Sequence, residues 1–191
     1  APEFCIDGRA GEIWEIKLEL KLIAEVGIIG LPNAGKSTLI SILSSASPKI
    51  ANYPFTTLVP NLGVVRKLDG NGCLFADIPG LISGAAEGIG LGHDFLRHIE
   101  RTKILIHLID VASENPLTDY QVIEEELDKY GNGLIKKERI IALTKIELVK
   151  KEYLKIITKK LENLSNKKVF VISSSLRKGL SQLLSEVWQK I

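Results

Sequence analysis

Short apolar runs alternate with amphipathic segments along this chain. In the amphipathic segments, apolar residues recur at helical spacing. Each run and the segment that follows it are, in order, 22–29 and 38–43, 104–109 and 122–130, 140–143 and 153–164, and 169–172 and 180–187. Continuous apolar strands separated by helices are typical of a mostly parallel sheet with both faces covered. The pattern therefore predicts an α/β fold with helices on both faces of one sheet.

Two segments depart from this alternation. Residues 59–67 and 72–75 are expected to form a hairpin around the turn at residues 69–72 (Asp-Gly-Asn-Gly), which makes residues 62–67 an antiparallel strand. With this strand the expected sheet is six-stranded and mostly parallel. Residues 12–22 alternate apolar and charged side chains, as a half-exposed strand does, so we expect residues 12–20 to extend from the sheet.

The composition fits one folded domain. The chain has 191 residues, of which 45% are hydrophobic and 25% charged. We assign residues 22–191 to this domain, and we interpret residues 1–21 as the scar of an expression tag (Ala-Pro-Glu-Phe) and the remnant of an upstream domain. No run reaches the ~18 apolar residues of a membrane span, and no signal peptide is recognisable. Cys5 and Cys73 lack metal-ligand spacing, which favours reduced thiols in the cytoplasm.

The charge balance says little about partners. A formal net charge of +2 does not imply nucleic-acid binding, although residues 150–168 are locally basic. We interpret that run as a solvated helix face, with a nucleic-acid surface as the alternative. The histidines at 93, 98 and 107 have no metal-ligand spacing and are assigned to surface or core packing.

Residues 30–37 read Gly-Leu-Pro-Asn-Ala-Gly-Lys-Ser, a complete phosphate-loop motif between an apolar run and a helical segment. That context suits the motif, because successive backbone N–H groups and a helix N-terminus together bind an anion. Lys36 reaches the terminal phosphates as a point charge, and the Ser37 hydroxyl is placed to ligate a Mg²⁺. The alternative is a chance Gly-rich turn.

A second motif, Asp-Ile-Pro-Gly at residues 77–80, ends a predicted strand and precedes a Gly-rich stretch at 84–92. The Asp77 carboxylate suits Mg²⁺ binding through water, and the Gly80 N–H suits a terminal phosphate. A third segment, residues 53–58, offers threonine hydroxyls to the same Mg²⁺. Without its neighbours this segment would be read as an ordinary Pro-containing turn.

Together these three segments closely resemble the bacterial Obg (CgtA) GTPases. The resemblance rests on residues 30–37, on residues 53–65 (Tyr-Pro-Phe-Thr-Thr-Leu-Val-Pro-Asn-Leu-Gly-Val-Val) and on the long Gly-rich loop 77–92. It covers essentially residues 12–191 and implies a P-loop NTPase fold. The family carries a Gly-rich domain before its GTPase domain, and residues 11–22 resemble the end of that domain.

The resemblance assigns roles residue by residue. It implies Mg²⁺ binding by Ser37, Thr57 and Asp77, and catalytic contributions from Lys36, Thr57 and Gly80. The nucleotide-binding residues that it implies are Gly30, Leu31, Pro32, Asn33, Ala34, Gly35, Lys36, Ser37, Thr38, Phe55, Thr56, Thr57, Asp77, Ile78, Pro79, Gly80, Thr144, Lys145, Ile146, Glu147, Ser173, Ser174 and Ser175.

The base-reading segment departs from the family pattern. Where the family has Asn-Lys-x-Asp, this chain has Thr144, Lys145, Ile146 and Glu147. Glu147 offers guanine the same two carboxylate oxygens as Asp on a stem one methylene longer. Thr144 cannot supply the amide of Asn, but its hydroxyl can brace the phosphate loop. Residues 173–175 resemble the Ser-Ala-x segment whose backbone meets the guanine carbonyl.

Two further residues bear on the rate. Leu81 stands where Ras-type enzymes hold a Gln that orients water, and no Arg lies in residues 45–58, so we expect slow hydrolysis. Asn33 resembles the residue that, in several related GTPases, helps bind a K⁺ beside the phosphates. The alternative is that Asn33 only braces the loop.

The resemblance implies a GTPase that binds GTP and GDP with Mg²⁺, carries switch loops near residues 45–58 and 81–96, and acts at the large ribosomal subunit in ribosome assembly or stress signalling. We expect a cytoplasmic monomer. One alternative is a nucleotide-gated ribosome-binding module in which hydrolysis is only a reset. The other is a P-loop ATPase or kinase, against which residues 55–57, 77–80 and 145–147 all argue.

Overall fold

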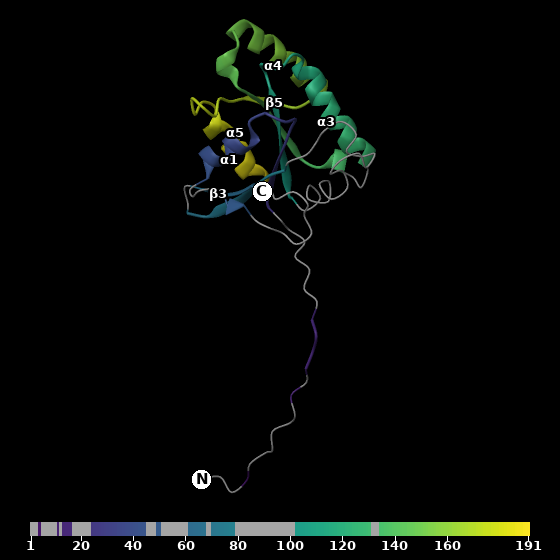
Figure 1. Ribbon diagram of the computed structural model, residues 1–191, viewed down its shortest axis with the longest axis vertical. Helices are drawn as coiled ribbons and strands as arrows, with labels where there is room; N and C mark the ends of the chain where they lie inside the picture. Colours follow the sequence, from purple (N-terminus) through teal and green to yellow (C-terminus); the bar gives the residue numbers. More distant parts are fainter. Residues whose placement is uncertain are drawn as a thin grey trace.

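The computed structural model describes residues 24–44, 61–67, 70–78, 102–130 and 134–191, the short strand 49–50, and positions 4, 11 and 13–16 near the N-terminus. The described residues form one sheet with helices packed against it (Figure 1). Its strands are β1 (Val26–Ile29), β2 (Lys49–Ile50), β3 (Asn61–Arg66), β4 (Gly72–Asp77), β5 (Ile104–Asp110), β6 (Arg139–Thr144) and β7 (Val169–Val171). The helices are α1 (Lys36–Leu43), α3 (Pro116–Tyr130), α4 (Lys151–Ser165) and α5 (Leu180–Lys190), with short 3-10 helices η2 (Leu134–Lys136) and η3 (Ile146–Leu148).

The sheet order is β2-β3-β4-β1-β5-β6-β7. All pairs from β4 through β7 are parallel, whereas β3 runs antiparallel to both β2 and β4. The predicted mostly parallel α/β sheet is thereby confirmed, including its antiparallel strand. Six strands were expected, and the described residues form seven, because the two-residue strand β2 is added at one edge of the sheet. The expected hairpin joins β3 to β4 with Arg66 opposite Gly72, and Gly70 adopts φ 87° in its turn.

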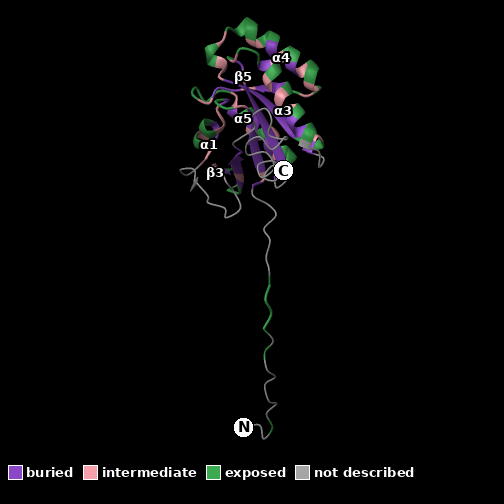
Figure 2. Ribbon diagram, turned by 45° about the vertical axis from the view of Figure 1, so that its right-hand side comes forward, coloured by how far each residue is buried: buried purple, intermediate pink, exposed green. Residues whose placement is uncertain are grey.

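Apolar residues on both faces of the central strands form the core. On β5, Ile106 belongs to the cluster of Leu39 from α1 and Leu183 from α5, whereas its neighbour Leu105 joins Ile123 of α3 on the opposite face. Because successive side chains on a strand point to opposite faces, a strand buried on both sides must be apolar throughout. Figure 2 shows the resulting layers, with buried strands between helices whose outer sides are exposed.

The local sequence determines where the helices begin. Helix α3 starts at Pro116, directly after Asn115, whose side-chain oxygen accepts a hydrogen bond from the Thr118 N–H at 3.3 Å. An asparagine before a helix is favoured because its side-chain oxygen accepts a hydrogen bond from an unpaired N–H of the first turn. Proline is favoured at the first position because it has no N–H to leave unpaired. Helices α3 and α4 have 15 residues each. Across the described ranges, no helix combines the length and apolarity needed to cross a membrane.

The expected strand at 12–20 is not present in the part of it that the structure describes. Residues 13–16 lie outside any strand, and Ile13, Trp14 and Ile16 are 101%, 76% and 74% exposed. Alternating apolar side chains favour a strand only where a partner strand and an apolar surface receive them. None of the described strands pairs with residues 13–16.

One polar cluster lies within the apolar interior. His107 of β5 is 1% exposed and stacks on Tyr120 of α3 with ring centroids 5.3 Å apart. Its Nδ1 lies 3.8 Å from a Glu124 oxygen, and the other Glu124 oxygen pairs with Arg139 Nη2 at 3.0 Å. Burial lowers the pKa of His107, although Glu124 acts in the opposite direction. The imidazole is therefore neutral in the folded protein at neutral pH.

This burial predicts a pH-dependent stability. Above the ordinary histidine pKa of about 6.5, the imidazole is neutral in both states. Below it, the unfolded chain takes up a proton that the folded chain does not, so the free energy of unfolding falls by up to about 1.4 kcal/mol per pH unit. Urea unfolding at about pH 7 and about pH 5.5 measures this slope. His107→Gln should flatten it, and an unchanged slope in that variant would contradict the prediction.

Candidate functional site

The phosphate-loop motif connects β1 to α1 and depends on positive backbone φ angles. Gly30 has φ 151°, and a Cβ built there would lie 2.4 Å from the Leu108 carbonyl oxygen, so only glycine fits. Asn33 (φ 63°) and Gly35 (φ 91°) also adopt left-handed backbone conformations. Such turns direct successive N–H groups toward a common centre, which makes an anion-binding concavity at the start of α1.

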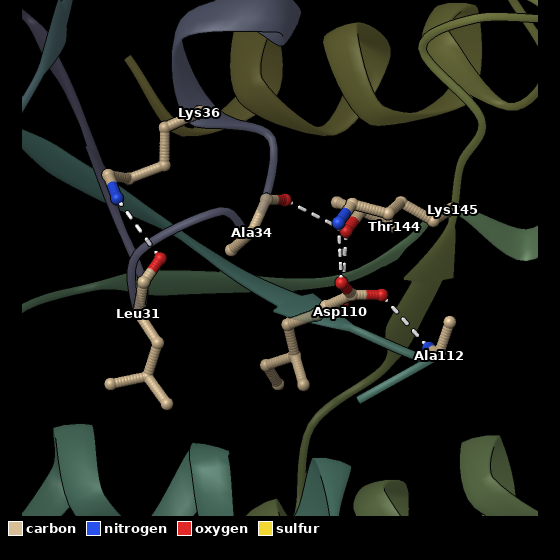
Figure 3. Close-up of polar contacts among 8 residues, drawn as sticks. Leu31, Ala34, Lys36, Asp110, Ala112, Thr144 and Lys145 are labelled. Atoms are coloured by element: carbon tan, nitrogen blue, oxygen red, sulfur yellow. Dashed lines mark hydrogen bonds and ion pairs between the residues drawn. The ribbon is translucent and has the colours of Figure 1, made fainter. Parts of the chain in front are cut away.

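Lys36 folds back across this loop. Its Nζ donates to the carbonyl oxygens of Gly30 at 3.1 Å and Leu31 at 3.2 Å, and Figure 3 shows the second contact. Burial lowers the pKa of the Lys36 ammonium, while the negative charge of Asp77 opposes the shift. The ammonium is thus held at the mouth of the loop, where it can meet an anionic ligand.

The neighbouring Ser37 contacts the second predicted motif. Its hydroxyl donates to Oδ2 of Asp77, which ends β4 and is 4% exposed. Within the described ranges, no hydrogen-bond partner reaches the other Asp77 oxygen, Oδ1. An orphaned carboxylate oxygen beside a hydroxyl is an all-oxygen donor set, the kind that Mg²⁺ prefers. Ser37 and Asp77 therefore fit the predicted metal, whereas Thr57 lies outside the described residues.

Thr144 ties the end of β6 to the phosphate loop. Its hydroxyl donates to the Ala34 carbonyl oxygen at 2.9 Å, with the Ile109 carbonyl oxygen 3.3 Å away. Thr144 is 3% exposed, and the contact joins residues 110 positions apart in the chain. The expected bracing of the loop by this hydroxyl is therefore confirmed, without the amide that the family pattern would place there.

Lys145 follows in a left-handed conformation, with φ 58°. Its Nζ pairs with Asp110 Oδ2 at 2.6 Å, and Asp110 Oδ1 accepts the Ala112 N–H at 2.9 Å. Figure 3 shows these contacts beside the Thr144–Ala34 bond. Sequence reasoning missed Asp110. The available signal was its position at the carboxyl end of a buried strand, where α/β sheets bind ligands.

Glu147 projects from η3 toward the loop after β7. Its Oε1 accepts a hydrogen bond from the Ser175 hydroxyl at 2.5 Å, and the Ser173 hydroxyl lies 3.2 Å from that of Ser175. Burial acts to raise the pKa of Glu147, but the hydroxyl groups of Ser175 and Ser173, its own backbone and the charge of Lys145 outweigh it and lower the pKa. Glu147 is thus ionised at neutral pH.

Two residues predicted to bind nucleotide direct their side chains elsewhere. Ile78 is 2% exposed and packs in the cluster of Leu105 and Ile123, and its N–H donates to the Ile28 carbonyl. Ile146 is half-buried and packs against the apolar cluster that includes Ile157 and Leu161 of α4. Hydrophobic burial accounts for both positions. The predicted residues that lie outside the described part of the chain are Phe55, Thr56, Thr57, Pro79 and Gly80.

Solved structures share this architecture. The G domain of the T. maritima FeoB iron transporter superposes with a TM-score of 0.59 at 24% identity, covering 86% of this chain and 96% of that one. Aquifex aeolicus Era, bound to GDP and AlF4−, gives a TM-score of 0.67 at 20% identity, covering 88% of this chain and 56% of that one. At these identities the likeness establishes the fold.

Sequence comparisons identify the family. The model described as "50S ribosome-binding GTPase" matches residues 25–145. GTPase Obg of Prochlorococcus marinus strain AS9601 is 78% identical over all 191 residues, and that of strain NATL1A is 62% identical over the same length. The chain spans 58% of the length of each. The chain therefore belongs to the family of 50S ribosome-binding GTPases, among the Obg proteins.

Proposed function

We propose that this chain binds GTP and GDP with Mg²⁺ and hydrolyses GTP slowly. The observation that carries the proposal is the hydrogen bond from Thr144 to Ala34, which fixes the segment 144–147 beside the phosphate loop. A nucleotide has two recognisable ends, and this bond sets the spacing between the groups that meet each end. Titration of labelled GDP, GTP and ATP onto the chain tests the proposal directly.

At the phosphate end, the chain supplies N–H groups, one cation and an oxygen pair. The loop 30–35 and the N-terminus of α1 meet phosphate oxygens, and Lys36 exchanges its carbonyl contacts for charge-assisted bonds to them. Ser37 and Asp77, together with Thr57, would hold Mg²⁺. When bound, this ion supplies positive charge beside the terminal phosphates. Gly80 is assigned to the terminal phosphate through its N–H.

At the base end, Glu147 accepts the imino and amino hydrogens of guanine. Adenine offers no such pair, and it would leave the carboxylate charge unpaired. Lys145, held by Asp110, lies beside this position with its aliphatic stem free to cover the base. The backbone of residues 173–175 meets the guanine carbonyl.

Turnover is proposed to be slow because Leu81 cannot orient water and no arginine precedes it in residues 45–58. Lys36 and the metal then meet only part of the charge that develops during hydrolysis. Asn33, exposed at the rim of the loop, is the candidate ligand for a K⁺ that would supply the remainder.

A second function concerns the partner. The family description names the 50S ribosome, and the curated relatives extend well beyond this chain. We propose that the protein acts at the large ribosomal subunit, in ribosome assembly or stress signalling, as a cytoplasmic monomer. In the second candidate function, docking gated by the nucleotide is the purpose and hydrolysis is a reset. Turnover measured with and without large subunits distinguishes the two.

Base selection gives the first test. Glu147→Ala should weaken GTP binding by about 2–3 kcal/mol, because two charge-assisted hydrogen bonds are lost. Glu152→Ala, at an exposed position in the first turn of α4, is the matched control and should leave affinity unchanged. Fluorescence titration measures both. If ATP competes equally with GTP on the unmodified chain, the assignment of Glu147 is wrong.

The bond between Thr144 and Ala34 gives the second test. Thr144→Val keeps the shape but leaves a buried carbonyl without its donor, which should cost about 1–2 kcal/mol of unfolding free energy. GDP affinity should fall as well. Thr158→Val, which removes a hydroxyl bonded within α4, should leave GDP affinity intact. Equal GDP affinity in both variants would show that the bond does not organise the site.

The cation gives the third test. Replacing Na⁺ by K⁺ at constant ionic strength should raise GTP turnover by about tenfold or more, because a fixed cation then meets the developing charge. Asn33→Ala should abolish this increase and leave GDP binding largely intact. Equal rates in the two salts would exclude the cation role and leave the missing catalytic group to a partner.

A further inference from the structure

The carboxylate that reads the base is held by a directed chain of hydroxyl groups. Glu147 is ionised, so it can only accept, and the Ser175 proton must point toward its Oε1 at 2.5 Å. A hydroxyl has one proton. Between the two serines, whose oxygens are 3.2 Å apart, Ser173 is therefore the donor and the Ser175 oxygen the acceptor.

The inner end of this chain is anchored in the fold. Ser173 is fully buried, and its Oγ accepts the Leu176 N–H at 3.0 Å. Its backbone forms a bridge with Lys178, with N–O distances of 3.1 and 3.0 Å in the two directions. The order of donors thus runs from the Leu176 N–H through Ser173 and Ser175 to Glu147. Every hydroxyl in it is oriented by the group before it.

The length of Glu147 explains why such a chain is useful. A glutamate carries one more methylene than an aspartate, and therefore one more dihedral angle that must be fixed before two oxygens can meet two hydrogens of a base. Glu147 is exposed, so core packing does not fix that angle. The hydrogen bond from Ser175 does, and Oε1 keeps a second lone pair for the ligand.

We propose that Ser175, oriented by Ser173, is a positioning residue that fixes the long side chain of Glu147 for guanine selection, a role that rests on the guanine-nucleotide function proposed above. In this arrangement a serine hydroxyl compensates for the longer stem at position 147. Because Ser175 acts through Glu147, the two substitutions should be non-additive, and Ser175 should matter little once Glu147 no longer needs to be positioned.

The test compares GDP with inosine diphosphate, which lacks the 2-amino group. Ser175→Ala should weaken GDP binding by about five- to tenfold and inosine diphosphate binding less, so the selectivity between them falls. Ser175→Thr keeps a hydroxyl and should restore it. Ser185→Ala, which removes an exposed hydroxyl bonded within α5, is the matched control and should change neither affinity.

Two further measurements distinguish positioning from a merely structural role: the coupling between substitutions at 147 and 175, and the pH dependence of GDP binding. In a Glu147→Asp background the shorter carboxylate no longer needs the hydroxyl, so adding Ser175→Ala should change GDP affinity by less than about twofold. Loss of the Ser175 donor should also raise the pKa at which GDP binding is lost in acid. Equal effects of Ser175→Ala in the two backgrounds, or an unchanged selectivity, would overturn the proposal.

The two proposals fail in different ways. If the unmodified chain binds neither GDP nor GTP, the guanine-nucleotide function itself is wrong. If it binds GDP in preference to ATP, and Ser175→Ala keeps the GDP selectivity of the unmodified chain, only the positioning role is wrong.

Discussion

The structure depends on burial of both faces of the parallel strands β1, β5 and β6. Side chains alternate along each strand, so these strands have no face on which polar residues can meet water. Polar groups are therefore found mainly where the strands end. Asp110 and Thr144 end β5 and β6, Gly30 follows β1, and Asp77 ends the neighbouring parallel strand β4. One edge of the sheet thereby gathers the chemistry of the protein.

Contacts between these strand ends hold their polar groups together in one candidate site. The Thr144 hydroxyl joins the phosphate loop to the segment 144–147, and the Lys145–Asp110 pair joins that segment to β5. Each contact has its partners on different elements, so the site is no more rigid than the packing of the sheet beneath it. In the proposed function this spacing matches the two ends of a nucleotide, and the bound ligand would in turn stabilise the contacts.

The departures from the family pattern are compensated locally. Thr144 lacks the amide of asparagine, but its hydroxyl still donates a hydrogen bond to the buried Ala34 carbonyl. Leaving that carbonyl without a donor would cost stability. The Glu147 carboxylate, on a stem one methylene longer than that of aspartate, accepts a hydrogen bond from the Ser175 hydroxyl. In the proposed function, both departures change the geometry of recognition while keeping its chemistry.

The sequence alone determined the strand and helix order, the hairpin of β3 and β4, and the phosphate loop, because apolar periodicity and glycine positions are local properties. The alternation at residues 13–16 is also a local property, but the strand that it predicted is not found, and none of the described strands pairs with these exposed residues. The contacts of Thr144 with Ala34, Lys145 with Asp110 and Glu147 with Ser175 were decided by the tertiary structure. They join residues 28 to 110 positions apart, and only the order of strands in the sheet brings such residues within hydrogen-bond distance.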